Sequence, residues 1–342
     1  MDVELLGTGG PDGWPAADCR CASCRRALAA GEPRAPLRVR IGGRFEPPGS
    51  APPPGHTMIN FVGGYELTGP AIRLIYAARP PQGAPVPPAG GYDVALVDLL
   101  DAPETLGALR RLGAAGPHTD VIAVGLDHRV SSPAELYRRA AYWGVRVVPD
   151  RTPLRPVGTV PRPRPRPDRV LLLGGARSGK SAEAERRLAG EPYVRYVATG
   201  EPGDGDPEWR ARVQAHVRRR PHWWSTTETL DLPAALGRPG EALLIDGLGT
   251  WLARTMDELG LWESARPDLA PLHDRIARLA GAWRGTVAHV VAVSDETGLG
   301  VVPATPAGRL FRDELGRLNA AIAAESEEVA LVVAGRVTPL PG

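Results

Sequence analysis

Residues 174–181 have the types and spacing needed to hold a nucleotide phosphate. They read GGARSGKS and fit the pattern G-x-x-x-x-G-K-S/T, in which glycines let backbone N–H groups face phosphate oxygens. The pattern assigns the β- and γ-phosphates to Lys180 and a Mg²⁺ ion to the Ser181 hydroxyl. The predicted nucleotide-binding residues of this loop are Gly174, Gly175, Ala176, Arg177, Ser178, Gly179, Lys180 and Ser181.

Two observations favour a phosphate loop over an ordinary glycine-rich turn. The loop lies between a short apolar run at residues 169–173, which is typical of a buried strand, and the helix-forming residues 182–188. Lys180 is the only lysine in the chain, in which lysine and arginine together number 41. An arginine cannot replace it, because an ammonium is a compact point charge that a guanidinium does not reproduce.

Two further residues have the chemistry of a phosphate-transfer site. Asp246 ends the apolar run 242–245, as in a second phosphate-loop strand whose aspartate binds Mg²⁺ directly or through water; a simple turn aspartate is the alternative. His216 falls on a predicted helix at residues 208–219 and precedes three arginines at 218–220. Such surroundings suit an unprotonated imidazole that attacks phosphorus, although a surface histidine would fit the same pattern.

The composition predicts an ordinary soluble protein of about two domains, given 342 residues. With a formal charge of +2 and 43% hydrophobic residues, the chain lacks the basic excess expected of a nucleic-acid partner. We find no apolar run of 18 residues and no signal-peptide pattern, so we expect a cytoplasmic protein without a membrane span.

Cys19, Cys21 and Cys24 form a compact C-x-C-x-x-C cluster. Three cysteines are an odd number within six positions and do not form a disulfide framework. Three thiolates this close can take three corners of a tetrahedral zinc site. Free cytosolic thiols in a loop are the alternative.

The chain divides into a front domain at 1–151, a linker at 152–168 and a nucleotide domain at 169–342. In the front domain, residues 44–91 are so rich in proline and glycine that much of this stretch should be loop, although a strand at 71–76 fits the sequence. The linker contains PRPRPRP, which favours an extended, semi-rigid spacer.

Strands and helices alternate in both domains. The front domain should have strands at 93–98, 121–124 and 145–148, with helices at 104–112 and 133–143. The nucleotide domain should have strands at 169–173, 193–199, 242–246, 287–293 and 329–333, with a long helix at 307–324. This alternation predicts an α/β fold with a mainly parallel sheet and helices on both faces. Together with the phosphate loop at 174–181, we expect a fold of the P-loop (RecA-like) type.

Residues 169–342 resemble the bifunctional adenosylcobinamide kinase and adenosylcobinamide-phosphate guanylyltransferase family of cobalamin biosynthesis. The matching segments, all in the family's order, are 174–181, 196–199, 212–221, 224–228, 246–251, 296–303 and 311–319. Two positions depart from the family pattern. Gly247 replaces a usual cysteine, and Asp295 replaces a usual asparagine.

The resemblance implies a kinase and nucleotidyltransferase. ATP or GTP would phosphorylate adenosylcobinamide, and GTP would then give GMP to a histidine and release pyrophosphate. The GMP would then be transferred from the histidine to adenosylcobinamide phosphate, giving adenosylcobinamide-GDP. The resemblance also suggests a homotrimer.

The guanylylated histidine of the family corresponds to His216, so the implied catalytic residues are His216, Lys180 and Asp246. The further nucleotide contacts implied by the resemblance are Thr199, Val217, Arg218, Arg219, Arg220, Glu228 and Asp246.

Residues 1–151 resemble the metallo-β-lactamase-type phosphodiesterases of phosphonate metabolism, through segments 6–9, 13–15, 19–24 and 126–128. The resemblance implies a structural zinc held by Cys19, Cys21, Cys24 and His128. The family's catalytic H-x-H-x-D-H run is absent, and Gly125 stands where the family has a metal-binding histidine. We therefore expect a truncated, degenerate domain without hydrolase activity.

Two other functions fit the phosphate loop by itself. One is a small-molecule kinase or NTPase with a single activity, and the other is a nucleotide-binding regulator without catalysis. His216 separates these hypotheses, because only the guanylyl transfer requires it.

Overall fold

The computed structural model describes residues 3–43, 46–47, 52, 54–70, 72–83, 86–154, 168–200, 218–238, 240–263 and 266–342. The chain forms two compact units. Unit 1 comprises Met1–Arg166 with Ala189–Pro192, and unit 2 comprises Pro167–Leu188 with Tyr193–Gly342. Among the described residues, no helix is long and apolar enough to cross a membrane.

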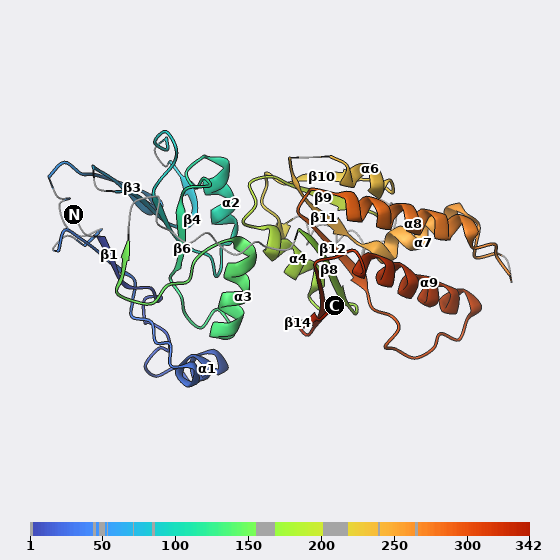
Figure 1. The fold of residues 1–342 in the computed structure, drawn as a ribbon. Coiled ribbons are helices and arrows are strands. Elements are labelled where there is room, and N and C mark those ends of the chain that lie inside the picture. Colours follow the sequence, from blue (N-terminus) through green and yellow to red (C-terminus); the bar gives the residue numbers. More distant parts are fainter. Residues whose placement is uncertain are drawn as a thin grey trace. The chain divides into compact units, whose positions relative to one another are not determined.

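Unit 1 is built on two sheets (Figure 1). A small antiparallel sheet has the order β2-β1-β7, made of β1 (Val3–Gly7), β2 (Arg38–Ile41) and β7 (Thr152–Leu154). The larger sheet has the order β3-β4-β5-β6, made of β3 (Thr57–Thr68), β4 (Arg73–Gln82), β5 (Val94–Asp98) and β6 (Asp120–Val124). Its helices are α1 (Ala22–Ala30), α2 (Glu104–Arg111) and α3 (Pro133–Trp143).

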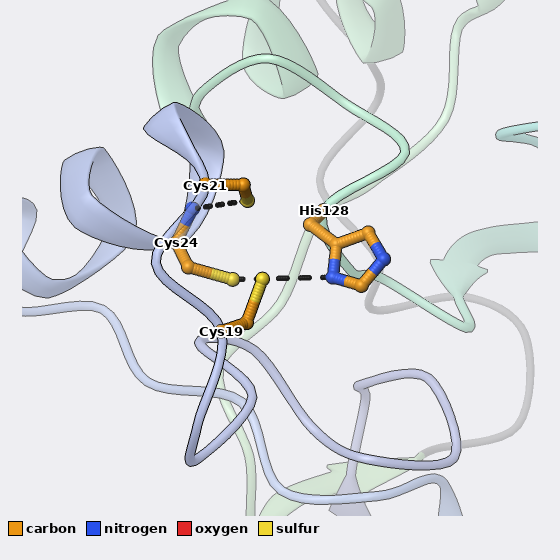
Figure 2. A group of neighbouring side chains, drawn as sticks. All are labelled: Cys19, Cys21, Cys24 and His128. Carbon is orange, nitrogen blue, oxygen red and sulfur yellow. Dashed lines mark hydrogen bonds between the residues drawn. The ribbon is translucent and has the colours of Figure 1, made fainter.

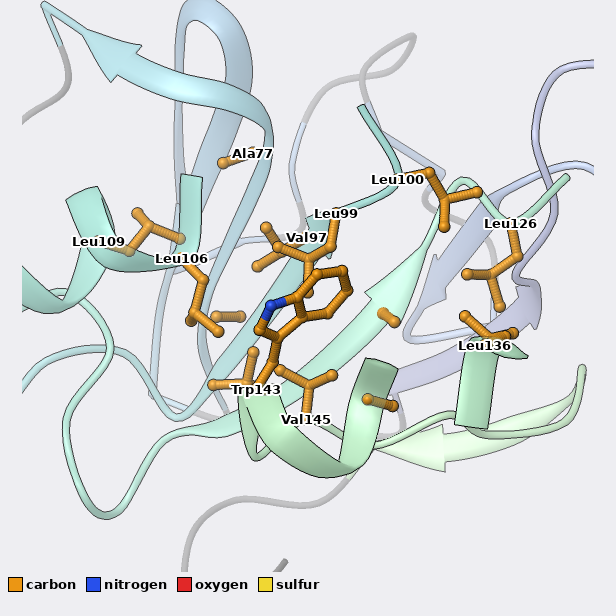
Figure 3. Close-up of a cluster of buried hydrophobic side chains, with 14 of the residues drawn as sticks. Ala77, Val97, Leu99, Leu100, Leu106, Leu109, Leu126, Leu136, Trp143 and Val145 are labelled. Atoms are coloured by element: carbon orange, nitrogen blue, oxygen red, sulfur yellow. The ribbon is translucent and has the colours of Figure 1, made fainter. Parts of the chain in front are cut away.

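The central strand β5 is apolar on both sides because two hydrophobic clusters cover the larger sheet. Along β5, Val94 and Leu96 join one cluster, whereas Ala95 and Val97 join the other. This follows from the alternation of side chains across a strand. The second cluster contains Trp143 of α3, which is fully enclosed (Figure 3).

The proline-rich region contains more strand than expected. The predicted strand at 71–76 belongs to β4, which continues through Pro80 and Pro81, whereas β3 was not predicted. The two prolines are tolerated because pairing with β3 is irregular there. Gly64 pairs with Ala77 and Val62 pairs with Gln82, so the prolines fall in the bulge between these pairs. The expected strand at 145–148 is only an isolated bridge between Arg146 and Ile122.

Unit 2 contains one sheet with the order β10-β9-β11-β12-β8-β13-β14 (Figure 1). All of its pairings are parallel except that of β14 with β13. The strands are β8 (Arg169–Gly174), β9 (Val194–Ala198), β10 (Ser225–Glu228), β11 (Ala242–Asp246), β12 (Val290–Asp295), β13 (Glu328–Val333) and β14 (Arg336–Leu340).

Helices cover both faces of this sheet, as the alternating pattern predicted. Leu171 and Ile245 pack in one cluster with α6 (Leu232–Leu236), α7 (Leu248–Glu258), α8 (Ala270–Gly285) and α9 (Pro306–Ala323). Leu172 and Leu244 pack on the other face with α4 (Lys180–Leu188). The mainly parallel α/β sheet is therefore confirmed, and it brings the ends of β8, β9, β11 and β12 to one edge.

Candidate functional site

The predicted phosphate loop connects β8 to α4 in a tight turn. Arg177 and Gly179 have positive φ angles of 57° and 98°. A Cβ on Gly174 would lie only 2.6 Å from both Ser178 Oγ and the Val332 carbonyl oxygen. The backbone therefore folds closely on itself, as a loop that surrounds a phosphate requires.

Lys180, the first residue of α4, is held at the loop by two oxygen atoms. Its Nζ lies 2.7 Å from Asp295 Oδ1 and donates a 3.3 Å hydrogen bond to the Gly175 carbonyl. Asp295 ends β12 and pairs in register with Gly174 of β8. The carboxylate thus reaches the ammonium because the two strands are neighbours in the sheet.

Asp246 lies at the carboxyl end of β11 and faces two hydroxyl groups. Ser181 Oγ donates to Asp246 Oδ1 at 3.4 Å, and the Tyr196 hydroxyl donates to Oδ2 at 2.5 Å. Burial, together with the Asp246 carboxylate, raises the pKa of Tyr196 above its usual range, so the phenol remains a donor. A serine hydroxyl and a carboxylate in this position are oxygen donors of the kind that Mg²⁺ binds.

Thr199 is fully buried and joins the end of β9 to the start of α7. Its hydroxyl donates to the Gly247 carbonyl at 2.7 Å and accepts from the Gly247 amide at 3.1 Å. Arg254 donates to the Thr199 carbonyl at 3.3 Å. These contacts assign Thr199 a role in holding the backbone beside Asp246.

Two of the predicted arginines approach the same region. Arg219 Nε donates to Glu185 of α4 at 2.8 Å, and this hydrogen bond raises the pKa of Arg219. The guanidinium of Arg220 lies 3.7 Å from the centre of the Tyr196 ring. Such stacking is favourable for a planar cation, and it connects Arg220 through Tyr196 to Asp246.

The remaining predicted nucleotide contacts are not placed at the loop by any described interaction. Arg218 and Glu228 are exposed. His216 and Val217 lie outside the described residues, as does most of the helix predicted at 208–219. Their roles remain those implied by the resemblance.

Sequence reasoning missed three residues that build this site. Tyr196 and Arg254 contact predicted site residues directly. Asp295 attracted notice only as a departure from a family pattern, yet it forms the ion pair with Lys180. The available signal was positional: polar residues that end neighbouring parallel strands meet at one edge, where open α/β sheets bind ligands.

Unit 1 contains a compact group of predicted metal ligands. The donor atoms of Cys19, Cys21, Cys24 and His128 all lie within 4.8 Å of one another (Figure 2). Cys24 Sγ lies 4.0 Å from His128 Nδ1, and the Cys24 amide donates to Cys21 Sγ at 3.4 Å. Tetrahedral zinc would hold such donors about 3.5–3.8 Å apart, so the four side chains fit the ion with small adjustments.

The two ends of this cluster differ in their electrostatic surroundings. The backbone N–H of Cys24 lowers the pKa of the Cys21 thiol, which caps the start of α1. Burial raises the pKa of Cys24 to about 11. A bound metal would therefore have to displace the proton of Cys24, because thiols coordinate as thiolates.

A second polar cluster of unit 1 lies after β5 and β6 and is centred on a guanidinium. Arg129 donates to Asp98 at 2.9 Å, to Asp101 at 2.9 Å and to Asp127 at 2.8 Å. It therefore forms ion pairs with three carboxylates near Gly125, the position at which the resembled family has a metal-binding histidine.

A family model described as "Cobinamide kinase / cobinamide phosphate guanyltransferase" matches residues 170–340. The chain belongs to this family. The match covers unit 2, including the phosphate loop, Tyr196, Asp246 and Asp295.

Curated relatives match the same half of the chain. It is 39% identical over 176 residues to the bifunctional adenosylcobalamin biosynthesis protein CobU of Salmonella typhimurium, covering 48% of this chain and 96% of that protein. It is 42% identical over 182 residues to the CobP protein of Pseudomonas aeruginosa, covering 51% of this chain and 98% of that protein. Nearly the full length of each relative is thus represented.

Among solved structures, this chain is similar to Zn²⁺-bound PqqB from Methylobacterium extorquens. The match covers 45% of this chain and 99% of the PqqB chain. The TM-score is 0.30 and the sequence identity is 16%. A likeness at this level does not define a fold. The metallo-β-lactamase-like character of residues 1–151 therefore remains a prediction from sequence motifs.

Proposed function

We propose that this protein catalyses two consecutive transfers in cobalamin biosynthesis. A nucleoside triphosphate phosphorylates adenosylcobinamide, and GTP then donates GMP to adenosylcobinamide phosphate. Membership of the cobinamide kinase / cobinamide phosphate guanyltransferase family supports both steps. The observation that carries the proposal is the convergence of Lys180, Ser181 and Asp246 at the loop where the triphosphate would bind.

In the kinase step, the chain's main task is to position the triphosphate and balance its charge. Backbone N–H groups of the loop would face the phosphates, and Lys180 would contact the transferred group. Ser181 and Asp246 would hold Mg²⁺, which supplies positive charge against the phosphate oxygens when bound. Tyr196 would orient Asp246 through its 2.5 Å hydrogen bond.

In the guanylyl step, His216 is proposed as the nucleophile. Its ring nitrogen would form a bond to the α-phosphorus of GTP as the bond to pyrophosphate breaks. A phosphate oxygen of adenosylcobinamide phosphate would then attack the same phosphorus and release the imidazole. Dividing one transfer into two displacements is the usual advantage of a covalent intermediate, and Arg219 and Arg220 would offset charge that develops on the phosphate.

Labelling with α-³²P-GTP tests this proposal. We expect the wild-type protein to retain an acid-labile, hydroxylamine-sensitive label and His216→Ala to retain none. His222→Ala is the matched control, because His222 is an exposed histidine of the following segment, and it should label as the wild type does. A label that persists in His216→Ala would exclude His216 as the nucleophile.

The alternatives are distinguished when adenosylcobinamide and γ-labelled GTP are added to this experiment. A single-activity kinase would phosphorylate adenosylcobinamide without forming a protein-bound label. A nucleotide-binding regulator would do neither. A homotrimer in the cytoplasm, inferred from the resemblance, is tested by sedimentation equilibrium and cell fractionation.

We further propose that unit 1 binds one structural zinc ion through Cys19, Cys21, Cys24 and His128. Their convergence within 4.8 Å supports this. The ion would connect the start of α1 with the segment after β6, which are far apart in sequence. A metal that binds only the folded arrangement adds its binding free energy to folding.

A further inference from the structure

The Lys180–Asp295 ion pair places a negative charge inside the proposed phosphate site. Lys180 Nζ and Asp295 Oδ1 are 2.7 Å apart. The Lys180 side chain is only 14% exposed, whereas that of Asp295 is 46% exposed. An anion that approaches Lys180 from solvent therefore meets the carboxylate at the same time.

The backbone of Asp295 is fixed by buried polar contacts. Asn319 Nδ2 donates to the Asp295 carbonyl at 3.0 Å, and Ser294 Oγ donates to Asn319 Oδ1 at 2.6 Å. Ser294 and Asn319 are both buried, and the Glu296 amide donates to the Gly174 carbonyl at 3.2 Å. Asp295 cannot leave the loop unless this buried network breaks, so only its side chain is able to turn.

The second carboxylate oxygen lies beside the first turn of α7. A Cβ added to Gly249, in the first turn of α7, would lie 3.0 Å from Asp295 Oδ2. The amino-terminal end of a helix attracts an anion. The carboxylate is therefore held between the Lys180 ammonium and the start of α7, and it would remain close to the phosphates of a bound nucleotide.

A carboxylate in this position opposes the binding of a triphosphate that carries no metal. Like charges separated by a few ångströms repel strongly where water is partly excluded. A divalent cation on the phosphates offsets most of this repulsion. The same carboxylate also orients Lys180, whose three N–H donors allow it to serve Asp295 and a phosphate together.

We propose that Asp295 makes nucleotide binding conditional on a divalent cation. It disfavours the metal-free triphosphate and admits the metal-bound form, while it keeps Lys180 directed into the loop. This inference rests on the nucleotide site proposed above and assigns Asp295 a role as a positioning and selectivity residue.

Calorimetric titration of the full chain with a non-hydrolysable GTP analogue, in Mg²⁺ and in EDTA, tests the proposal. For the wild type we expect much weaker binding in EDTA. Asp295→Asn should strengthen binding in EDTA on the order of tenfold and change binding in Mg²⁺ by less than about threefold. Asp274→Asn, which removes an exposed carboxylate of α8, should leave both affinities unchanged.

Each other outcome overturns the inference in a recognisable way. Unchanged binding of Asp295→Asn in EDTA would show that the carboxylate exerts no selectivity. Weaker binding in Mg²⁺ would identify Asp295 as a metal ligand instead. Failure of the wild type to bind the analogue under either condition would refute the nucleotide site itself. If Asp295→Asn does not fold, as judged by its thermal unfolding, Asp295→Ser serves in its place.

Discussion

At the scale of single residues, the site depends on the contacts made to Asp246. This carboxylate accepts hydrogen bonds from Ser181 and from Tyr196, and Arg220 stacks on the Tyr196 ring. A metal ligand with such a supporting partner is oriented before the ion arrives. Residues that support a ligand in this way typically affect metal affinity by one or two orders of magnitude when removed.

Tyr196→Phe should therefore raise the Mg²⁺ concentration needed for half-maximal kinase activity by about tenfold. The ring that stacks with Arg220 is retained, so loss of the hydroxyl is the relevant change. Tyr193→Phe is the control, because this substitution removes an equivalent hydroxyl from a tyrosine that is 49% exposed. A Mg²⁺ requirement equal to that of the wild type would show that Asp246 does not need this hydrogen bond.

At the scale of elements, five strands of unit 2 could be predicted because each is a buried apolar run. The strands β10 and β14 were not predicted, because their sequences STTE and RVTPL are polar or exposed. The expected strand at 287–293 begins later, at Val290, because Val287 is 86% exposed. In unit 1 the extension of β4 beyond the predicted strand at 71–76 was missed, since irregular pairing with β3 accommodates Pro80 and Pro81. Pairing between strands is a tertiary feature that a local sequence does not reveal.

The same limit applied to the site. Loop chemistry identified Lys180 and Ser181, and the strand end identified Asp246. The Lys180–Asp295 contact depends on β12 lying beside β8 in the sheet order. Sequence order separates these strands by three others, so this neighbour relation could not be read from the chain.

The cluster of Cys19, Cys21, Cys24 and His128 is also a property of elements, because it joins α1 to the segment after β6. Metal analysis of the purified protein should give about one zinc per chain, and a strong chelator should lower the thermal stability of unit 1. Cys21→Ser should lose the metal. His118→Ala should keep it, because His118 lies outside the cluster. Protein that is free of zinc and unaffected by the chelator would contradict this proposal.

At the scale of the whole molecule, two units with separate chemistry share one chain. Nearly all of the region that matches the family model lies in unit 2. Unit 1 contains the thiol–imidazole cluster and three aspartates that are hydrogen-bonded to Arg129. The predicted transferase chemistry therefore needs only groups of unit 2.

The central claim is that one protein adds both a phosphate and a GMP to the same acceptor. Incubation of the full chain with adenosylcobinamide and a mixture of α- and γ-labelled GTP tests it most directly. We predict a product that carries both labels, and for His216→Ala a product that carries only the γ label. Wild-type protein that yields no doubly labelled product would contradict the account.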